Sequence, residues 1–526
     1  MRVLVCDGLE KAGIDILRRM ESLAVDERPD LGREDLKNII GEYDALIVRS
    51  KTKVDADIVE RGRKLSLIGR AGTGVDNIDV AAATRRGIVV MNAAEGNTVT
   101  TAEHAFAMLM ACARQIPQAT ASLKSGKWEK KKFLGVELMG KTLGIIGLGR
   151  IGRAVAERAV CFRMKVVGFD PYFTAEAAAK LGIEMVPLDD LFSRADFLTV
   201  HTSLTDETRG IINAAAFAKM KTGVRVINCA RGGLVDEQAL AEAIRAGKVA
   251  GAALDVFEEE PPPAGSPLLG MEQVIVTPHL GASTEEAQVG VATIIAEQVL
   301  DYFKQGTIRG AVNAPAISAE ALAKVGPYIS LGEKLGLFQG QVFGHDLREV
   351  NIEYAGEVSE NDVSPITQAI LAGLLSPVIE RVNMINARIV AEERGIKVTE
   401  SAIRRARDFA SLISIRALTR QKESEVAGAL LDHRDARIVR INGFNTEAIP
   451  RGHMLIIFNK DVPGALGRIA SYLGERGVNI GRLYLGRKKI GETALSLVQT
   501  DQPISPQEIT SLTALQDVIS AQQIRL

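Results

Sequence analysis

A short apolar run that ends in the spacing G-x-G-x-x-G constrains the fold of this chain more than any other feature. The run occupies residues 142–152, and its pattern predicts a strand followed by a helix over 153–160. In such a turn Gly147 permits a tight bend, Gly149 lets the backbone approach a pyrophosphate, and Gly152 lets the helix pack closely on the strand. The first N–H groups of the helix then face the phosphates. The stretch therefore predicts a dinucleotide-binding unit, and the alternative is a purely structural glycine turn.

A carboxylate after the next predicted strand indicates which dinucleotide binds. That strand covers residues 165–169 and is followed by Asp170. A dinucleotide fold needs an acid about 20 residues beyond the glycines, where it accepts hydrogen bonds from the adenosine ribose hydroxyls. Because a carboxylate would repel a 2′-phosphate, Asp170 predicts NAD rather than NADP.

The length, charge and cysteine content exclude several classes of protein. A chain of 526 residues is too long for one core, so several domains are expected. A net charge of −1 offers no basic field for nucleic acid, and no apolar run is long enough for a membrane helix. The cysteines lie far apart and form no CxxC pair, which is typical of free thiols in a reducing compartment. We therefore expect a cytoplasmic protein without a metal site, and the cysteines are Cys6, Cys112, Cys161 and Cys229.

Strand-like and helix-like segments alternate along the first part of the chain. Repeated alternation of this kind predicts parallel, doubly wound sheets. Strands are expected at 2–6, 45–49, 67–70, 88–91, 142–146, 165–169, 197–201, 224–228, 251–255 and 274–277. Long helices are expected at 101–114 and 284–304, and the tract 311–315 is expected to be a linker.

The chain beyond residue 315 follows a different pattern. A strand is expected at 346–355, and a helix is expected to begin at Ser376, with Pro377 at its first position and Gly395 after its end. From about residue 450 the order strand, helix, strand, strand, helix, strand predicts an α+β sandwich. Its segments are 454–458, 465–474, 479–486, 492–500, 506–514 and 518–524.

Three kinds of polar side chain follow predicted parallel strands, at the edge where such sheets place ligands. Arg231 lies in a glycine-flanked turn, His279 follows a short apolar strand, and acids occupy positions 258–260. A guanidinium can hold a carboxylate bidentately, an imidazole can take a hydroxyl proton, and a carboxylate can fix the imidazole tautomer. Together they suit hydride transfer from a hydroxy acid.

Each of these residues has an ordinary alternative. Arg231 could be a surface cation, His279 a polar cap, and the acids solvated side chains. Among the other histidines, His104 is expected to be structural, and His201 ends a strand near the predicted cofactor.

Four motifs together resemble the D-isomer-specific 2-hydroxyacid dehydrogenases. They are G-L-G-R-I-G at 147–152, N-C-A-R-G-G-L-V-D-E at 228–237, D-V-F-E-E-E-P-P at 255–262 and T-P-H-L-G-A-S at 277–283. The resemblance implies that Arg231 binds substrate, that Glu260 supports the histidine, and that His279 is the acid/base. Glu260 is favoured because the family's acid directly precedes the proline pair. The chain departs from the family at Ser203, where relatives often carry proline.

The resemblance also implies a set of NAD contacts. These are Gly147, Gly149, Arg150, Ile151, Gly152, Asp170, Thr202, Cys229, Ala230, Asp255 and Gly281. Loops at 48–50 and 69–77 resemble those of family members that act on 3-phosphoglycerate. They imply that Arg49 and Arg70 hold a phosphate, with Gly72 and Asn97 also at the substrate; the alternative for the two arginines is an ion pair that stabilises the fold.

The C-terminal part resembles the appended domains of long-form family members. The tail is similar to an ACT domain, a small regulatory module, and the region before it to an intervening domain. The implied fold is α/β: a Rossmann-type NAD domain inserted in a flavodoxin-like substrate domain, both doubly wound, plus an α+β intervening domain and an ACT α+β sandwich. The expected bounds are 1–95 and 284–315 for the substrate domain, 96–283 for the NAD domain, 316–447 for the intervening domain and 448–526 for the ACT domain.

The resemblance implies NAD-dependent oxidation of 3-phosphoglycerate to 3-phosphohydroxypyruvate in serine biosynthesis, by a homo-oligomer and in particular a tetramer. L-Serine is the expected effector, and it would bind Asn459, Asp461 and, across a subunit interface, Asn479. Two alternatives remain. One is a dehydrogenase for glycerate, lactate or glyoxylate, and the other is an NAD-sensing binding protein without catalysis. The appended domains and Arg49 with Arg70 argue against the first. The ACT-like tail and the lack of a partner-recruiting disordered segment argue against the second.

Overall fold

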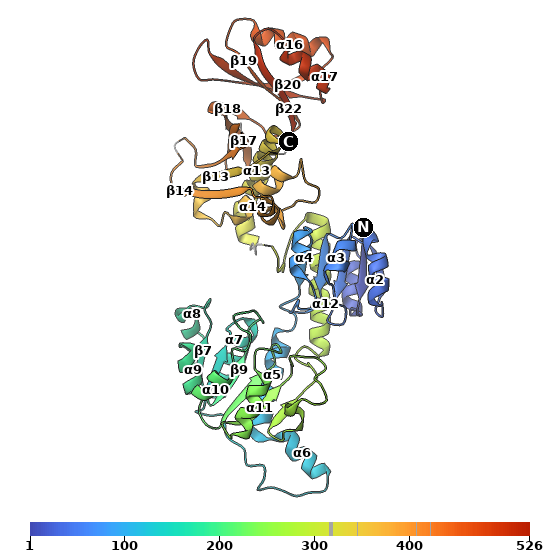
Figure 1. The fold of residues 1–526 in the computed structure, drawn as a ribbon, viewed down its shortest axis with the longest axis vertical. Helices are drawn as coiled ribbons and strands as arrows, with labels where there is room; N and C mark the ends of the chain where they lie inside the picture. Colours follow the sequence, from blue (N-terminus) through green and yellow to red (C-terminus); the bar gives the residue numbers. More distant parts are fainter. Residues whose placement is uncertain (315–318, 345, 407, 421) are drawn as a thin grey trace.

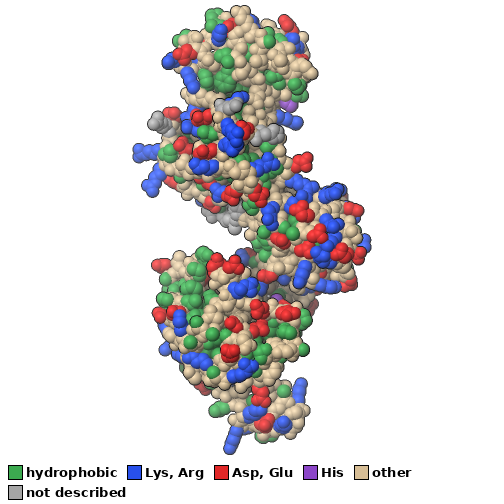
Figure 2. All heavy atoms as spheres, in the orientation of Figure 1, with side chains coloured by type: hydrophobic (Ala, Val, Ile, Leu, Met, Phe, Trp, Pro, Cys, Tyr) green, Lys and Arg blue, Asp and Glu red, His purple; other side chains and the backbone are tan. Residues whose placement is uncertain are grey.

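The computed structural model describes residues 1–314, 319–344, 346–406, 408–420 and 422–526. Figure 1 shows an elongated molecule, with the C-terminal sheet at one end and the sheet of the glycine-rich motif at the other. Acidic and basic side chains are interspersed over the face shown in Figure 2, and the net charge of the chain is −1. Among the described residues, no helix has the length and apolar character needed to span a membrane.

The first sheet is fully parallel, with strand order β2-β1-β3-β4-β5. Its strands are β1 (Arg2–Cys6), β2 (Ala24–Arg28), β3 (Ala45–Val48), β4 (Leu67–Arg70) and β5 (Val89–Asn92). The helices over it are α1 (Lys11–Leu17), α2 (Arg33–Ile39), α3 (Ala56–Arg61), α4 (Val80–Arg85) and α12 (Glu285–Gln305), with a 3-10 turn at Ile40–Glu42. One face packs on α1 and α12, and the other on α2, α3 and α4. The expected return of the chain to this sheet through the helix after Gly281 is therefore confirmed.

The tract expected to be a linker lies against this sheet as far as it is described. Ala311 forms an antiparallel bridge to Met91, and the Asn313 side chain accepts a hydrogen bond from the Val90 N–H. Pro315, the last residue of the predicted linker, lies outside the described residues.

The second sheet has seven parallel strands in the order β12-β11-β10-β9-β6-β7-β8. Its strands are β6 (Thr142–Ile146), β7 (Lys165–Phe169), β8 (Ile183–Met185), β9 (Phe197–Val200), β10 (Val224–Asn228), β11 (Val249–Leu254) and β12 (Val274–Val276). Its helices are α5 (Thr98–Arg114), α6 (Ile116–Lys124), α7 (Arg150–Cys161), α8 (Ala175–Ala179), α9 (Leu188–Arg194), α10 (Ala214–Lys219) and α11 (Glu237–Arg245), with a 3-10 turn at Pro267–Gly270. The strand order reverses between β6 and β9, which is where doubly wound sheets bind ligands.

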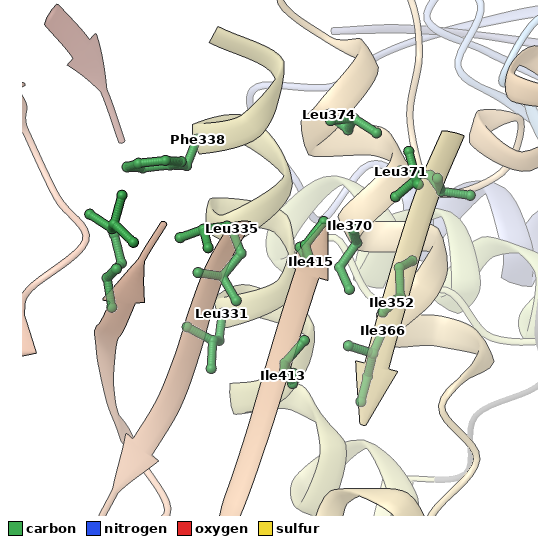
Figure 3. Close-up of a cluster of buried hydrophobic side chains, with 14 of the residues drawn as sticks. Leu331, Leu335, Phe338, Ile352, Ile366, Ile370, Leu371, Leu374, Ile413 and Ile415 are labelled. Atoms are coloured by element: carbon green, nitrogen blue, oxygen red, sulfur yellow. The ribbon is translucent and has the colours of Figure 1, made fainter. Parts of the chain in front are cut away.

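The third sheet is mixed, because β13 pairs in parallel with β14 while the other pairs are antiparallel. Its strands are β13 (Glu349–Gly356), β14 (Lys397–Ile403), β15 (Ser411–Leu418), β16 (Glu423–Leu431), β17 (Asp435–Ile441) and β18 (Phe444–Ala448). Its helices are α13 (Ala319–Phe343), α14 (Ser364–Leu375) and α15 (Ala387–Glu393), with a 3-10 turn at Glu357–Glu360. Figure 3 shows side chains of α13 and α14 meeting those of β13 and β15 in one apolar core.

The prediction that a helix begins at Ser376 is wrong. Ser376 is the C-cap of α14, and its hydroxyl donates to the Gly373 carbonyl. The chain then turns away, and Ile385 packs into the core of the first sheet. A Ser-Pro pair is a local signal, and this tertiary contact overrides it.

The fourth sheet is antiparallel, with the order β20-β21-β19-β22. Its strands are β19 (His453–Lys460), β20 (Ile480–Arg487), β21 (Thr493–Thr500) and β22 (Val518–Arg525), and its helices are α16 (Ala465–Glu475) and α17 (Pro506–Thr513). The helices cover one face. On the other face Met454, Ile456 and Leu497 join the core of the third sheet. The predicted α+β order of this tail is confirmed.

Candidate active site

The glycine-rich turn after β6 is shaped by close backbone contacts. Gly147 has a φ of +91°, and a Cβ added there would lie 2.6 Å from the carbonyl oxygen of His201. A Cβ on Gly152 would lie 2.0 Å from the carbonyl oxygen of Gly147. By contrast, nothing lies within 4 Å of a Cβ built on Gly149, which is the N-cap of α7. The turn is therefore packed on its inner side and open where a pyrophosphate would approach the helix N-terminus.

Asp170 braces this turn. Its carboxylate accepts hydrogen bonds from the backbone N–H groups of Leu148 and Tyr172, both at 2.8 Å. The predicted acid thus lies directly beside the glycine-rich loop, at the end of β7. The open N-terminus of α7 and this adjacent carboxylate are the two features that an NAD adenosine and pyrophosphate require, so the residues present fit NAD.

The other predicted NAD contacts surround the carboxyl ends of the central strands. Arg150 and Ile151 begin α7, and Arg150 forms an ion pair with Glu95 at 3.1 Å. Thr202 follows β9, and its backbone nitrogen would lie 3.1 Å from a Cβ on Gly147.

Two more predicted contacts follow β10. Cys229 is buried, which raises the pKa of its thiol. The Ala230 N–H donates to the side chain of Asn228 at 3.0 Å, and the Asn228 amide donates to the Arg231 carbonyl at 2.8 Å. Asn228 therefore shapes the turn that presents Arg231.

His279 and Glu260 form a hydrogen-bonded pair after β12. The Nδ1 atom of His279 lies 2.8 Å from Glu260 Oε2, and both side chains are partly exposed. Glu260 also accepts a hydrogen bond from the Phe257 N–H at 3.1 Å. Burial opposes ionisation of Glu260, but the hydrogen bond and charge of His279 and the hydrogen bond from the Phe257 N–H together hold the pKa of Glu260 below its ordinary value. The carboxylate is thus ionised at neutral pH and fixes the orientation of the imidazole.

The turn that carries His279 is anchored on Asp255, which is fully buried. Its carboxylate accepts hydrogen bonds from the Leu280 N–H at 2.7 Å and the Gly281 N–H at 2.8 Å. Its backbone carbonyl accepts from the His279 N–H at 2.9 Å. His279 itself has a φ of +55°, a left-handed conformation that these anchors hold in place.

Arg231 reaches from the second sheet to a loop of the first. Its Nε donates to Asp76 Oδ2 at 2.8 Å and its Nη1 to the Ala230 carbonyl at 2.6 Å. Its Nη2 lies against Gly74, where an added Cβ would be only 1.7 Å away. Asp76 and Gly74 were not predicted as site residues. Only their place in the resembling loop 69–77 pointed toward them.

Arg70 is the last residue of β4, at the start of the loop that Arg231 reaches. A Cβ on Gly72 would lie 1.7 Å from Arg70 Nη1, so this glycine makes room for the guanidinium. Burial, together with the nearby charges of Arg231 and Arg49, lowers the pKa of Arg70 to about 10, which leaves it cationic at neutral pH. The guanidinium groups of Arg70 and Arg231 thus meet the same loop from two different sheets.

Two side-chain contacts hold the backbone of this region. The Arg49 N–H donates to Asp7 Oδ2 at 2.9 Å, and the Asn97 side chain accepts from the Thr73 hydroxyl at 2.5 Å. Asn97 is the N-cap of α5, so the predicted substrate residues Arg49, Arg70, Gly72 and Asn97 lie in one region. Thr73 is a further member that the motif analysis missed.

The predicted regulatory residues are separated within one chain. The buried Asn459 accepts from the Ser496 hydroxyl at 2.8 Å, and Asp461 accepts from the Gly491 N–H at 3.1 Å. Asn479 lies at the opposite end of the sheet, where its amide donates to Asp501 at 2.6 Å. A ligand that contacts both ends would therefore need a second copy of the chain.

Comparisons with known proteins agree with this geometry. Residues 106–281 match the model described as D-isomer specific 2-hydroxyacid dehydrogenase, NAD binding domain. A solved glyoxylate reductase from Paecilomyes thermophila shares 31% identity and a TM-score of 0.55, over 59% of this chain and 98% of that one. The chain is therefore a D-isomer specific 2-hydroxyacid dehydrogenase, with NAD as its cofactor.

Two more matches cover the C-terminal part. Residues 324–442 match the D-3-phosphoglycerate dehydrogenase intervening domain, and residues 453–517 match the ACT domain. The D-3-phosphoglycerate dehydrogenases of Archaeoglobus fulgidus and Bacillus subtilis are each 42% identical to it, over all of this chain and 100% and 99% of theirs. Within its class, the chain belongs to the D-3-phosphoglycerate dehydrogenase family.

Proposed function

We propose that the chain oxidises 3-phospho-D-glycerate to 3-phosphohydroxypyruvate, the step that opens the phosphorylated route to serine. The observation that carries this proposal is that the guanidinium groups of Arg70 and Arg231 lie against Gly72 and Gly74 of one loop, while the charge of Arg49 acts on Arg70. A substrate with a carboxylate at one end and a phosphate at the other needs several cations, whereas an unphosphorylated hydroxy acid needs fewer.

Each side chain has one role in the proposed reaction. Nε2 of His279 takes the C2 hydroxyl proton, while its Nδ1–H group donates to Glu260, which stabilises the imidazolium that forms. The Arg231 guanidinium holds the substrate carboxylate and the developing carbonyl oxygen. Arg49 and Arg70 hold the phosphate. NAD, when bound, accepts the hydride from C2.

The proposed cofactor contacts follow from the same arrangement. Gly147, Gly149 and Gly152 with the first turn of α7 receive the pyrophosphate, and Asp170 receives the ribose hydroxyls. The remaining proposed contacts are Arg150, Ile151, Thr202, Cys229, Ala230, Asp255 and Gly281.

An assay with NAD separates this function from its alternatives. We expect 3-phosphoglycerate to be oxidised with a kcat/KM well above those of glycerate and lactate. Equal rates on unphosphorylated acids would identify a different hydroxyacid dehydrogenase. NAD binding without turnover of any of them would identify a non-catalytic sensor, a reading that the His279–Glu260 pair does not favour.

We also propose that L-serine binds the ACT domain of a homo-oligomer and inhibits. Asn459 and Asp461 would supply one side of the site and Asn479 of a second copy the other. Serine must bind the less active state more tightly in order to inhibit. We expect serine to bind and inhibit the wild type, and Asp461→Ala to lose both effects. Binding of serine without inhibition would contradict the proposed inhibitory role of the ACT domain.

The oligomer and its compartment are part of the same proposal. We infer a tetramer, and the exposed apolar side chains of Trp128, Leu134 and Ile490 support burial against other copies. Sedimentation equilibrium would measure the assembly, and a monomer would contradict it. The described cysteines are free, which suits the cytoplasm.

A further inference from the structure

The buried carboxylate of Asp255 is the anchor of the catalytic turn. The N–H groups of Leu280 and Gly281 and the hydroxyl of Thr277 all donate to it, at 2.8 Å or less. These partners flank His279 on both sides in sequence. Any change in the charge or position of Asp255 therefore changes the place of the imidazole relative to Glu260.

One further donor reaches this carboxylate from outside the turn. Nε2 of His104, on α5, lies 3.1 Å from Asp255 Oδ1 and 3.3 Å from the Thr277 hydroxyl. Burial opposes ionisation of Asp255, but the hydrogen bonds from His104, Thr277 and the Leu280 N–H, together with the charge of His104, keep its pKa below the ordinary value. His104 is thus the only described side chain from another helix that donates to this carboxylate.

We propose that His104 is a positioning residue for His279: its Nε2–H group donates to Asp255 and so holds the turn on which His279 faces Glu260. The proposal rests on the proposed function, since it assigns His279 the proton transfer. A buried carboxylate deprived of a donor is left partly unpaired, which costs more than an ordinary hydrogen bond contributes.

The same helix also reaches the substrate loop. Asn97, the N-cap of α5, accepts from Thr73, and His104 follows seven residues later. Seven residues are about two helical turns, so both positions lie on one face of α5. The helix therefore joins the loop that carries Arg70 to the carboxylate that holds the catalytic turn.

The test compares variants at His104 with a neighbour on α5. His104→Leu removes the donor, and His104→Asn shortens the side chain so that it cannot reach Asp255. His104→Gln keeps an amide N–H at about the same reach. Glu103→Gln is the matched control, because Glu103 pairs outward with Arg158 at 2.9 Å.

We expect His104→Leu and His104→Asn to lower kcat about 10- to 100-fold, the scale on which small misplacements act, while KM for 3-phosphoglycerate changes little. His104→Gln should recover most of the rate, and Glu103→Gln should match the wild type. Wild-type kcat in either of the first two variants would overturn the proposal, as would equal losses in His104→Leu and His104→Gln.

The pH profile gives a readout that a purely structural role would not move. Without the His104 donor the pKa of Asp255 rises, so kcat in His104→Leu should begin to fall at a higher pH on the acid side than in the wild type. The other titratable groups near Asp255 are Cys229 and Glu260. In both the wild type and Glu103→Gln, Glu260 keeps its hydrogen bond from His279. The two proteins should therefore show the same pH dependence of kcat.

A chemical probe keeps the inference testable if 3-phosphoglycerate is not the substrate. Diethyl pyrocarbonate acylates accessible imidazoles, and mass spectrometry reports the rate at His279 alone. A turn released from Asp255 should raise that rate severalfold in His104→Leu and leave it unchanged in His104→Gln. An unchanged rate in both would overturn the role of His104, whereas absent turnover in the wild type would overturn only the proposed function.

Discussion

His279 has the two properties that a proton-transferring side chain needs, an accessible ring and a fixed orientation. Its ring is partly exposed, while Nδ1 is held 2.8 Å from Glu260. We expect His279→Ala to lower kcat at least about 100-fold, because general acid/base groups contribute on that scale. The affinity for NADH, measured by fluorescence, should stay close to the wild-type value. A variant with unchanged kcat would remove His279 from the mechanism.

Gly74 is the residue whose replacement would test the place of Arg231 most directly. A Cβ there would lie 1.7 Å from Arg231 Nη2, so Gly74→Ala must displace the guanidinium. We expect kcat/KM for 3-phosphoglycerate to fall about 10-fold or more, the size of effect that a misplaced substrate group has.

The control is Gly270→Ala, since nothing lies within 4 Å of a Cβ at that position. Its kcat/KM should match the wild type. If Gly74→Ala were as active as this control, the position of the Arg231 guanidinium beside Gly74 would not matter for substrate binding.

At the scale of elements, α13 and α14 pack backbone against backbone through glycines. A Cβ on Gly336 would lie 2.0 Å from the Ile370 carbonyl oxygen, whereas nothing lies within 4 Å of one on Gly326 of the same helix. We expect Gly336→Ala to lower the free energy of unfolding by about 1–3 kcal/mol through overpacking.

Gly326→Ala is the matched control. Alanine is the better helix former, but Pro327 follows and disfavours the α conformation of a residue with a Cβ, so the free energy of unfolding should change by less than about 1 kcal/mol. Thermal unfolding of the two variants would compare them in one experiment. Equal unfolding temperatures of the two variants would show that α13 and α14 can move apart at Gly336 without a loss of stability.

Elements with a buried apolar pattern could be predicted from sequence, and those without it could not. The buried strands of the two parallel sheets and the glycine-rich turn were predicted within a few residues. The edge strands β2, β8 and β14 were not predicted, and neither were β15 to β18 of the third sheet. Lys397–Ile403 is almost wholly exposed, so it carries no apolar pattern to read. The approach of Asp76 and His104 to the site also required the fold, since Asp76 had no role of its own within the loop 69–77 and His104 lies in no motif.

At the scale of the whole molecule, the third sheet is docked on the first by two asparagines. The Asn383 amide donates to the Gly87 carbonyl at 2.7 Å, and the buried Asn386 amide donates to the Arg85 carbonyl at 3.1 Å. Arg85 ends α4 and Gly87 follows that helix, just before β5. On β5, the Asn92 side chain donates to the Thr73 carbonyl in the loop 69–77.

We expect Asn386→Ala to leave a carbonyl unpaired at this contact, at a cost of about 1–3 kcal/mol. Hydrogen exchange of residues 84–90, measured by mass spectrometry, should become faster. Asn361→Ala is the control, because among the described residues the Asn361 side chain bonds within its own 3-10 turn, to the Glu357 carbonyl at 3.0 Å. Unchanged protection in Asn386→Ala would mean that other contacts carry the docking.

The apolar core shared by the third and fourth sheets has a consequence for how such a tail can be inherited or transplanted. Met454, Ile456 and Leu497 are buried in the same cluster as Leu331 of α13. A cut in the gene between the two sheets would expose the apolar side chains of both halves of that core. Recombination therefore cannot move the fourth sheet and its helices alone. A chimera that exchanges effector specificity should instead carry residues from α13 to the C-terminus as one inherited block.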